Sequence, residues 1–269
     1  MHDVRLDHPR GGAAIVTGAT LSVAAGEVVV IVGAAGVGTS RLVAAALGEH
    51  PAAGGTITML GHDVGKLRRS SLRLLRRRIG IVPQDLCLLE DRSVQLNVIM
   101  PLEIDGVPRS ISLLRAAECL ARVGLESEAS LPLDCLPPSA RQRVAVARAL
   151  VRDPELVIAD HPTSLQDAAG AELVCGAIAE SARAGAACIL LGRDPALRVI
   201  AEREGWRQLA LVGGLLRPLG EVLLDGKTIE ELLVDLVSVP LRAPAAAADA
   251  GADHIPNLIQ FPSAAGGVA

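Results

Sequence analysis

Short apolar runs alternate with helix-forming stretches along most of this chain. The runs have the length and the near-continuous apolar character of strands that are buried on both faces. Four of them stand out, at 28–32, 79–83, 156–159 and 187–191. The stretches with the leucine and alanine spacing of helices are 41–47, 66–78, 136–150 and 168–183. This alternation predicts an α/β fold with a mostly parallel sheet that helices cover on both faces.

The beginning and the middle of the chain depart from this alternation. Residues 3–32 predict several short strands joined by glycine turns, which we expect to add N-terminal antiparallel strands to the fold. Residues 94–125 are helical in pattern, with expected breaks at Pro101 and Pro108. We assign them to a helical subdomain inserted at about 85–140.

The length of the chain allows one large α/β domain or two small ones, and its end has a composition that packs poorly. Half of the 269 residues are apolar but only 1% are aromatic, so valine, leucine, isoleucine and alanine must build the core. The end of the chain is rich in alanine and low in complexity, a composition that resists packing. The expected divisions are a domain at 1–220, an extension at 221–240 and a flexible tail at 241–269.

Charge and cysteine content narrow the choice of partner and compartment. The net charge is −4, so we expect no nucleic-acid partner. The five cysteines form no C-x-x-C pair, and we expect them to be reduced core residues of a cytosolic protein. The N-terminus carries acids instead of an apolar signal core, and no run is long enough to span a membrane. A position at a membrane would therefore require a partner.

Arginines gather in one of the predicted helices and at its end. A solvated helix face is the favoured interpretation, and a surface that meets lipid headgroups or a membrane partner is the alternative. The run consists of Arg68, Arg69, Arg73, Arg76, Arg77 and Arg78.

A glycine-rich turn follows the first buried strand and leads into a helix. Its residues are Gly33, Ala34, Ala35, Gly36, Val37, Gly38, Thr39 and Ser40. A turn in this position aims backbone N–H groups at a phosphate, and its spacing fits the template G-x-x-x-x-G-K-[ST]. Thr39 stands where that template has lysine. A dinucleotide-binding turn, as in some reductases, is the alternative, although no acid ends a second strand about 20 residues later.

Polar or glycine residues follow the ends of four predicted strands. These residues are Gly33, Gln84, Asp160 and Arg193. Because ligands gather at the carboxyl ends of parallel strands, we expect these positions to share one functional edge.

Five segments, taken in order, resemble the ATP-binding subunits of ABC transporters over roughly residues 3–220. Besides the glycine turn they are IGIVPQD, LLEDRSVQLNVIMPL, RQRVAVARALVRDPELVIADHPTSLQD and ILLGRD. Within that family the resemblance points to the FtsE-type cell-division proteins, which pair with an FtsX-type permease. It implies a P-loop NTPase-like ABC nucleotide-binding domain.

The resemblance also implies ATP and Mg²⁺ as ligands and assigns residues to each. The turn at 33–40 and Arg41 would hold the phosphates, and His8 stands where an aromatic stacks on adenine. Ser40, Gln84 and Asp160 would hold Mg²⁺.

Most groups that the family uses for hydrolysis are replaced here. Thr39 replaces the lysine, which forfeits a charge-assisted contact of roughly 1.5–3 kcal/mol. His161 replaces the glutamate that polarises the attacking water, and Arg193 replaces the switch histidine. The signature segment at 136–141 contains two prolines, and the D-loop at 164–166 lacks an acid by the same comparison. Taken together, the substitutions at positions 39, 161 and 193 give the pocket one more positive charge than the family's pocket has.

These substitutions predict a hydrolysis-impaired ATP-binding subunit with weak ATP binding. It would lie at the inner face of the plasma membrane with an FtsX-like permease, which Gln84 and residues 85–125 would contact, and would serve cell division as scaffold or nucleotide sensor. A head-to-tail homodimer is a further expectation. The alternatives are a slow but functional ABC ATPase and a dinucleotide-binding reductase-like domain.

Overall fold

A parallel sheet forms the centre of the molecule. The computed structural model describes residues 1–8, 14–33, 38–224 and 227–228. The sheet has six strands in the order β11-β10-β3-β9-β8-β7, and all neighbours are parallel except β10 and β11. Its strands are β3 (Val28–Val32), β7 (Ile79–Val82), β8 (Leu156–Asp160), β9 (Ala187–Leu191), β10 (Arg207–Val212) and β11 (Leu215–Pro218). The predicted α/β class and the four predicted buried strands are confirmed.

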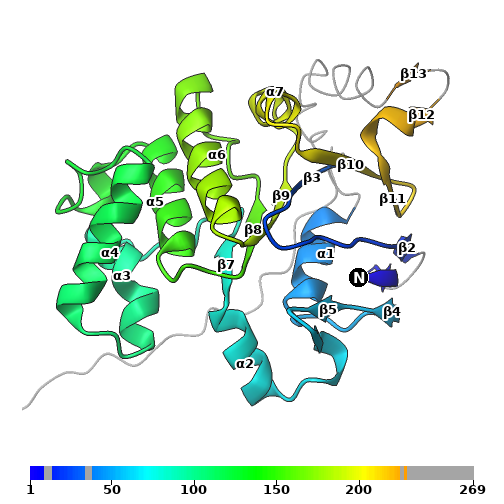
Figure 1. Cartoon of the computed structure of the whole chain (residues 1–269), viewed down its shortest axis with the longest axis horizontal. Coiled ribbons are helices and arrows are strands. Elements are labelled where there is room, and N and C mark those ends of the chain that lie inside the picture. The colour runs from blue at the N-terminus through cyan, green and yellow to red at the C-terminus, as the bar shows by residue number, and fades with distance from the viewer. Residues whose placement is uncertain (9–13, 34–37, 225–226, 229–269) are drawn as a thin grey trace, which may run out of the picture.

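Helices cover one face of this sheet, and two helices and a second sheet cover the other (Figure 1). The first group comprises α3 (Val94–Ile104), α4 (Arg109–Arg122), α5 (Pro138–Leu150), α6 (Ala168–Arg183) and α7 (Pro195–Arg203). The second group comprises α1 (Thr39–Ala46), α2 (Arg69–Arg77), β1 (His2–Asp7), β2 (Ala14–Ala19) and β4 (Gly54–Thr56). Strand β1 pairs antiparallel with β2 and with β4, which confirms the expected N-terminal antiparallel strands.

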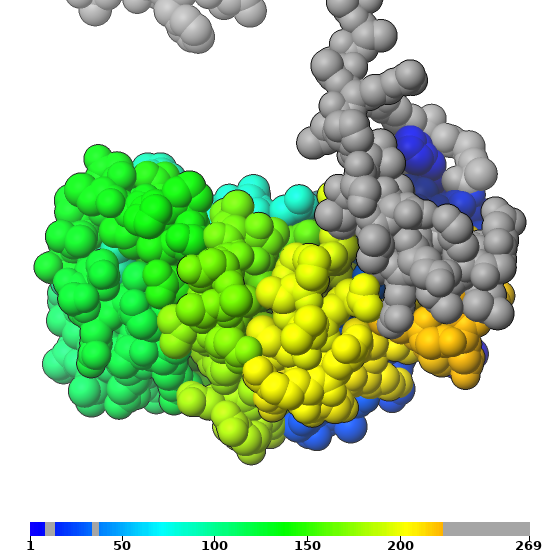
Figure 2. Space-filling model, turned by 90° about the horizontal axis from the view of Figure 1, so that it is seen from above, coloured from blue at the N-terminus to red at the C-terminus, as the bar shows by residue number. Residues whose placement is uncertain are grey.

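Short elements complete the described chain. They are β5 (Thr58–Met59), β6 (His62–Asp63), β12 (Leu223–Leu224), β13 (Lys227–Thr228) and three single turns of 3₁₀ helix, at Val64–Lys66, Leu133–Cys135 and Leu219–Glu221. Seen from above, the helical insert, α6 and α7 lie in sequence across one side of the molecule (Figure 2).

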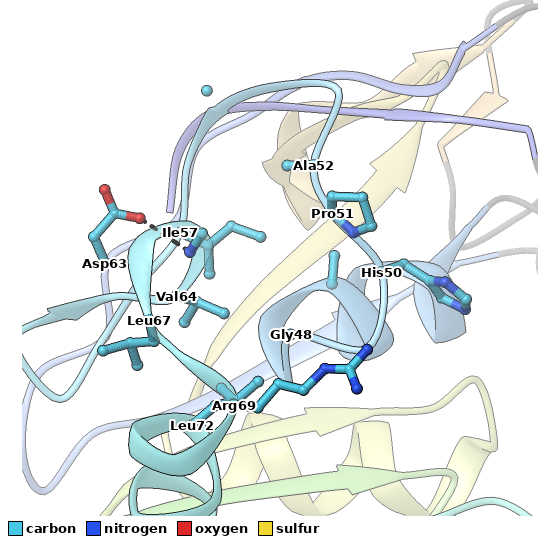
Figure 3. A pocket seen from close by; sticks show the side chains of 13 residues that line it. Gly48, His50, Pro51, Ala52, Ile57, Asp63, Val64, Leu67, Arg69 and Leu72 are labelled. Carbon is cyan, nitrogen blue, oxygen red and sulfur yellow. Dashed lines mark hydrogen bonds between the residues drawn. The ribbon is translucent and has the colours of Figure 1, made fainter.

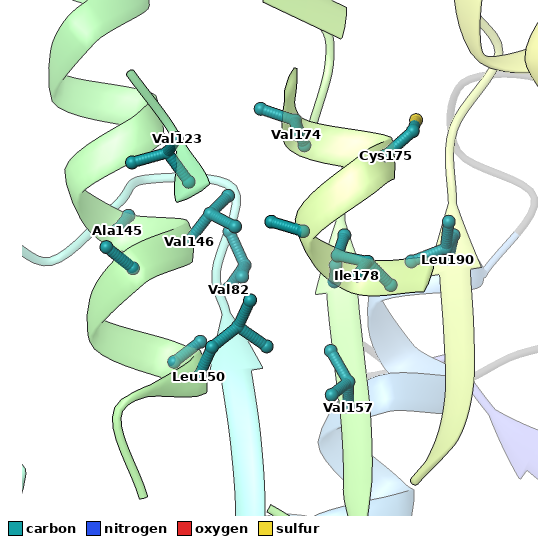
Figure 4. Close-up of a cluster of buried hydrophobic side chains, with 14 of the residues drawn as sticks. Val82, Val123, Ala145, Val146, Leu150, Val157, Val174, Cys175, Ile178 and Leu190 are labelled. Atoms are coloured by element: carbon teal, nitrogen blue, oxygen red, sulfur yellow. The ribbon is translucent and has the colours of Figure 1, made fainter. Parts of the chain in front are cut away.

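The strands are buried on both faces, so alternate residues enter two separate cores. Val157 and Leu190 point to the side of α5 and α6, together with Ile178 (Figure 4), and Val30 belongs to the same core. The neighbouring residues Val29, Ile158 and Ile189 pack with α1 and α2 on the other side. Such two-sided burial explains why these strands are apolar at nearly every position. It also holds the polar residues that follow the strands at one edge.

One of the two breaks expected in the insert is absent, for a packing reason. Pro101 does not break the insert, because α3 runs through it and buries Val98, Ile99 and Leu102 around it; packing outweighs the lost backbone hydrogen bond. The break at Pro108 is confirmed, since α4 begins directly after it.

The cysteines are all free, but they are not all core residues. Cys119, Cys175 and Cys188 are buried, and burial raises the pKa of the Cys119 thiol to about 11 and that of the other two to about 12. Cys87 and Cys135 are exposed, which corrects the expectation for these two. Among the described residues, no helix is long and apolar enough to cross a membrane. The predicted tail at 241–269 and most of the extension lie outside the described residues.

Candidate functional site: a phosphate turn facing a carboxylate

The carboxyl ends of the parallel strands meet at one edge, as predicted. Gly33 follows β3, Gln84 follows β7 by two residues, and His161 follows β8. Arg193 follows β9 by two residues. Backbone bonds tie the edge together: Gly192 N–H donates to the Ile31 carbonyl at 3.2 Å, and His161 N–H donates to the Leu191 carbonyl at 2.7 Å.

Asp160 is the buried carboxylate of this edge, and two side chains contact it. Ser40, in the first turn of α1, donates its hydroxyl to Oδ2 at 3.2 Å. Nδ1 of His161 lies 2.8 Å from Oδ1. The three groups are not a serine-hydrolase triad, because the carboxylate and not the imidazole receives the serine hydroxyl. They form an arc of polar atoms with the carboxylate at its centre.

His161 faces this carboxylate because of its backbone. Its φ of 55° is in the left-handed region, which histidine adopts more readily than most residues. Its carbonyl accepts hydrogen bonds from Gln142 Nε2 at 2.9 Å and from Ser164 Oγ at 3.0 Å. With both backbone groups bonded, the turn holds the imidazole against the preceding residue.

The phosphate turn is described at its two ends. Gly38 has a φ of 104°, and a Cβ at this position would lie 2.4 Å from Cγ2 of Ile15, so only glycine fits. Gly38 caps α1, whose first turn contains Thr39 and Ser40 and no acid. The uncapped N–H groups of that turn favour an anion. Ala34, Ala35, Gly36 and Val37, predicted phosphate contacts, lie outside the described residues.

The remaining predicted residues lie in different surroundings. Arg41 donates from Nη2 to the Asp7 carbonyl at 3.2 Å, so its guanidinium bonds the end of β1. His8 is exposed directly after β1. Gln84 and Arg193 are exposed at the sheet edge, and neither makes a hydrogen bond or ion pair to the described residues. Their predicted roles thus remain predictions.

Gln142 lies on α5, the helix that contains the end of the signature segment, and it joins this helix to the segment after β8. It was not among the functional residues predicted from the sequence. It is 2% exposed and also bonds Ser164 Oγ, Leu165 N–H and Gln166 Nε2 at 2.9 to 3.2 Å. Gln166 in turn donates to the Ser139 carbonyl at 2.8 Å, inside the signature segment. The acid counted as missing from the D-loop stands one residue further on, where Asp167 caps α6. In the sequence, Gln142 could have been found as an amide side chain on the otherwise apolar face of this helix.

The signature segment itself keeps a helical start despite its prolines. Pro137 is the N-cap of α5 and Pro138 its first residue, where no intrahelical N–H is needed. Arg141 donates from Nε to the Leu136 carbonyl at 3.0 Å. The prolines therefore remove two donors without removing the helix.

Arg148 of α5 performs a second joining role. Its guanidinium donates to the carbonyls of Leu86 and Cys87, both at 2.5 Å. These two residues follow Gln84 with positive φ angles of 60° and 45°, which is uncommon for side chains other than glycine. Burial lowers the pKa of this arginine. Its bonds hold the turn after Gln84 in a conformation that few residues adopt unaided.

The residues present fit Mg²⁺ and a nucleotide phosphate in type. A hydroxyl and a carboxylate within 3.2 Å are hard oxygen donors of the kind Mg²⁺ prefers, and the start of α1 is an anion site by geometry. Among the described residues, no group of three His, Cys, Asp or Glu side chains forms a metal cage. An ion here would therefore depend on water and phosphate oxygens for most of its ligands.

A pocket of about 360 Å³ lies away from this edge, past the C-terminal end of α1 (Figure 3). Apolar side chains including Ile57 and Leu72 line it together with His50, Asp63 and Arg69. None of the nucleotide- or metal-binding residues predicted from the sequence contributes to it.

The arginine run of α2 is only partly a free solvated face. Arg76 donates to the Leu47 carbonyl at 2.8 Å. Arg77 pairs with Asp105 at 3.3 Å, and Arg78 pairs with Glu155 at 2.6 Å. These contacts join the helix to α1, to the insert and to β8, so part of the run is structural.

A glycine-rich segment joins a central parallel strand to a helix whose first turn contacts a carboxylate at the end of a nearby strand, which defines a P-loop nucleotide-binding domain. The model of the ABC transporter family matches residues 16–164, more than half of the chain. This chain therefore belongs to the ABC transporter family, and it has the fold of that family's nucleotide-binding ATPase domain. Membership decides against the reductase-like alternative.

Several similar proteins are named as import ATP-binding proteins. A methionine import ATP-binding protein MetN of Caulobacter vibrioides is 37% identical over 66% of this chain and 53% of its own length. The MetN of Brucella abortus is 34% identical over 76% of this chain and 55% of its own. A phosphonates import ATP-binding protein PhnC of Frankia casuarinae is 41% identical over 61% of this chain and 68% of its own. The chain spans about half the length of the MetN proteins that it matches.

These names do not support the finer likeness to FtsE-type proteins. The relatives above are import proteins, and none of them is named for cell division. Among solved structures, the dimeric ATP-binding cassette MJ0796, in a post-hydrolysis state with ADP and Pi, superimposes with a TM-score of 0.72 at 25% identity. The match covers 80% of this chain and 95% of that one.

We predict that Gln142→Ala lowers the free energy of unfolding by about 2 kcal/mol, because it leaves the Leu165 N–H without its buried acceptor and removes one of the donors to the His161 carbonyl. Urea denaturation followed by circular dichroism measures the change. Gln95→Ala is the matched control, since no side-chain bond of Gln95 joins it to the described residues, and its effect should stay within about 0.5 kcal/mol. Equal effects of the two variants would contradict the joining role.

Proposed function

We propose that this chain is the ATP-binding subunit of an ABC-type membrane import complex, and that it binds nucleotide weakly and hydrolyses it poorly. The observation that carries the proposal is the pairing of Asp160 with Ser40 on one side and with His161 on the other. The first contact retains the family's metal-binding pair. The second places an imidazole where the family has its catalytic carboxylate.

Binding is supported by the groups that remain. The start of α1 and Gly38 present backbone N–H groups to an anion. Ser40 and Asp160 would hold Mg²⁺, which neutralises phosphate charge when it is bound. Without a lysine at position 39, these groups lack one charge-assisted contact, so we propose weak binding.

Poor hydrolysis is supported by charge at the same edge. Thr39 places no cation on the phosphates, and Arg193 cannot accept a proton. His161 brings an imidazole, which carries no negative charge in either protonation state, so it polarises water less than the family's glutamate would. Groups that act as one unit lose most of their effect when one member is lost.

A slow but functional ATPase is the second candidate, and one contact favours it. If Nδ1 of His161 carries the proton and donates it to Asp160, Nε2 remains free to accept a proton from water. A carboxylate that orients an imidazole in this way is a common arrangement for a general base. This candidate differs from the first in the rate alone.

The partners in this proposal are a permease, in place of the FtsX-like one expected above, and a second ATP-binding subunit. Exposed apolar side chains on the insert support a docking surface, with Ile104, Ile111 and Leu114 each at least 45% exposed. Residues 85–125 and Gln84 would form this surface at the inner face of the plasma membrane. Head-to-tail pairing is proposed from the dimeric relative.

We predict that the purified protein with its permease turns ATP over at the background rate, equal to that of Asp160→Asn. Thr39→Lys and His161→Glu should each restore little, and together they should restore more than the sum of the two. Steady-state phosphate release measures the rates. A wild-type rate of about 1 s⁻¹ or more, abolished by Asp160→Asn, would show that hydrolysis is not impaired. If His161→Ala also loses that rate, the result would establish the functional ATPase with His161 as its base.

We predict that Arg193 takes over part of the role of the absent lysine. Its guanidinium can bind phosphate oxygens in a bidentate manner from the edge next to β9. Titration calorimetry should show ATP affinity falling about tenfold or more in Arg193→Ala, which is the value of a charge-assisted contact. Arg183→Ala, exposed at the C-terminal end of α6, controls for the loss of charge. Equal affinities in both variants would discard the compensation.

We predict that Leu114→Asp releases the protein from membranes that contain its permease. Loss of one apolar anchor at an interface costs about 1–2 kcal/mol, or roughly tenfold in affinity. Val199→Asp is the matched control, because Val199 on α7 is 63% exposed and Leu114 is 62% exposed. Co-sedimentation with membranes measures the bound fraction. If both variants remain bound equally, the insert is not the docking surface.

A further inference from the structure

Two recesses adjoin between α2 and the C-terminal end of α1, the end opposite the candidate nucleotide site. The first is the pocket of about 360 Å³ described above. The second has a volume of about 560 Å³, and three arginines of α2 line it. Gly48, Arg69 and Leu72 line both recesses. The two therefore form one continuous depression with an apolar part and a cationic part.

The cationic part is a stripe of arginine side chains. Arg69, Arg73 and Arg76 are spaced i, i+4 and i+7, which places them on one side of α2. Arg69 and Arg73 are exposed and make no hydrogen bond or ion pair to the described residues. Arg76 bonds the Leu47 carbonyl through Nε alone, which leaves its Nη groups for a ligand. Like charges at this spacing destabilise a helix, so an anion that contacts the stripe would remove a repulsion.

The negative groups nearby do not cancel this positive charge. Asp63 lines the apolar recess, but Lys66 pairs with it at 2.9 Å, and its carboxylate lies across the pocket from the Arg69 guanidinium (Figure 3). Glu49 is the one acid among the described residues that line the cationic recess. The partial negative charge at the end of α1 is reduced by hydrogen bonds to its last carbonyls.

The apolar part lies directly beside Arg69 and can accept a small hydrocarbon group. Ile57, Leu67 and Leu72 are among the residues that line it. A Cβ on Gly48 would lie 2.8 Å from Cδ2 of Leu72, so this glycine keeps the junction of the two recesses open. Apolar walls next to a few charged groups are the usual lining of a small-molecule site.

We propose that this depression is a second ligand site, which binds a phosphate monoester that carries a small apolar group. The phosphate lies among the three arginines, whose planar guanidinium groups bind phosphate oxygens in a bidentate manner. Three arginines less one glutamate leave two positive charges. They match the about two negative charges of a phosphate monoester better than the single charge of a carboxylate. The apolar group fills the recess beside Leu72.

The test uses phenyl phosphate, which has both parts of the proposed ligand, and inorganic phosphate, which has the anionic part alone. Titration calorimetry on the full-length protein should show phenyl phosphate binding about tenfold more tightly than phosphate, because its ring is buried. Phenyl phosphate should also raise the midpoint of thermal unfolding, since it binds the folded chain. Equal affinities of the two compounds would overturn the proposal.

Two pairs of variants separate the cationic part from the apolar part. Arg69→Ala and Arg73→Ala should each weaken phenyl phosphate binding about tenfold, the value of one charge-assisted contact. Arg68→Ala is their control, because this exposed neighbour lines neither recess, and it should leave the affinity unchanged. Ala52→Leu narrows the apolar recess and should abolish the preference for phenyl phosphate over phosphate. Ala53→Leu, at an exposed position outside the lining, should retain it.

Vesicles that contain phosphatidic acid test a lipid as the source of the phosphate. Vesicle binding in addition to phenyl phosphate binding, weakened by Arg69→Ala, would support a lipid ligand of the same site. Binding to vesicles alone, with none to phenyl phosphate at millimolar concentration, would overturn the site and assign the arginines to a membrane surface. An equal loss of affinity in Arg68→Ala and Arg69→Ala would also overturn it, as unspecific attraction of charge.

The proposal does not depend on the proposed nucleotide function, and ATP titrations keep the two apart. Ser40 lies in the first turn of α1, whereas this depression lies past the last turn. ATP affinity should be unchanged in Arg69→Ala, and phenyl phosphate affinity should be unchanged in Ser40→Ala. Phenyl phosphate binding without ATP binding would leave this site standing and reject the nucleotide function. An ATP affinity that falls in Arg69→Ala would overturn the separation of the two sites.

Discussion

The burial of one carboxylate constrains the whole functional edge. Asp160 ends a strand that is covered on both faces, so its charge must be balanced by nearby donors. Ser40 reaches it from α1, and His161 reaches it through a left-handed turn. The start of α1 and the end of β8 are thereby held together. The chemistry of the site follows from what else can approach these three side chains.

Two polar side chains on α5 extend this constraint into the helical side of the molecule. Gln142 bonds the segment that follows Asp160, and Arg148 bonds the turn that follows Gln84. Both side chains are largely buried, so loss of Arg148 would leave the carbonyls of Leu86 and Cys87 without their donor, and loss of Gln142 would leave the Leu165 N–H without its acceptor. One helix thus holds the two loops that flank the edge. A shift of α5 would move both loops, which is a physical route from the insert to the site.

The sequence predicted the parts of this architecture that depend on continuous patterns. Apolar runs bounded by glycine and proline predicted four buried strands, α6 and the position of Asp160 at a strand end. Pro101 within α3 and the exposure of Cys87 did not follow, because tertiary packing and a strained turn decide them. The contacts of Gln142 and Arg148 were also invisible, since they join segments about 20 and 60 residues apart. The FtsE-type assignment rested on short motifs, whereas the similar proteins found over 61–76% of the chain are named for import.

Substitutions at this edge change charge more than shape. Gly38 admits no side chain, and the turn at His161 is held by backbone bonds that any residue tolerating its left-handed backbone can make. Thr39 and Arg193, by contrast, alter the local charge and leave the strand ends where they are. A match of the fold therefore depends on Gly38 and on the backbone at His161, and it gives no information on Thr39 and Arg193. Membership of the ABC family and capacity for hydrolysis are separate properties of this chain, because different atoms determine them.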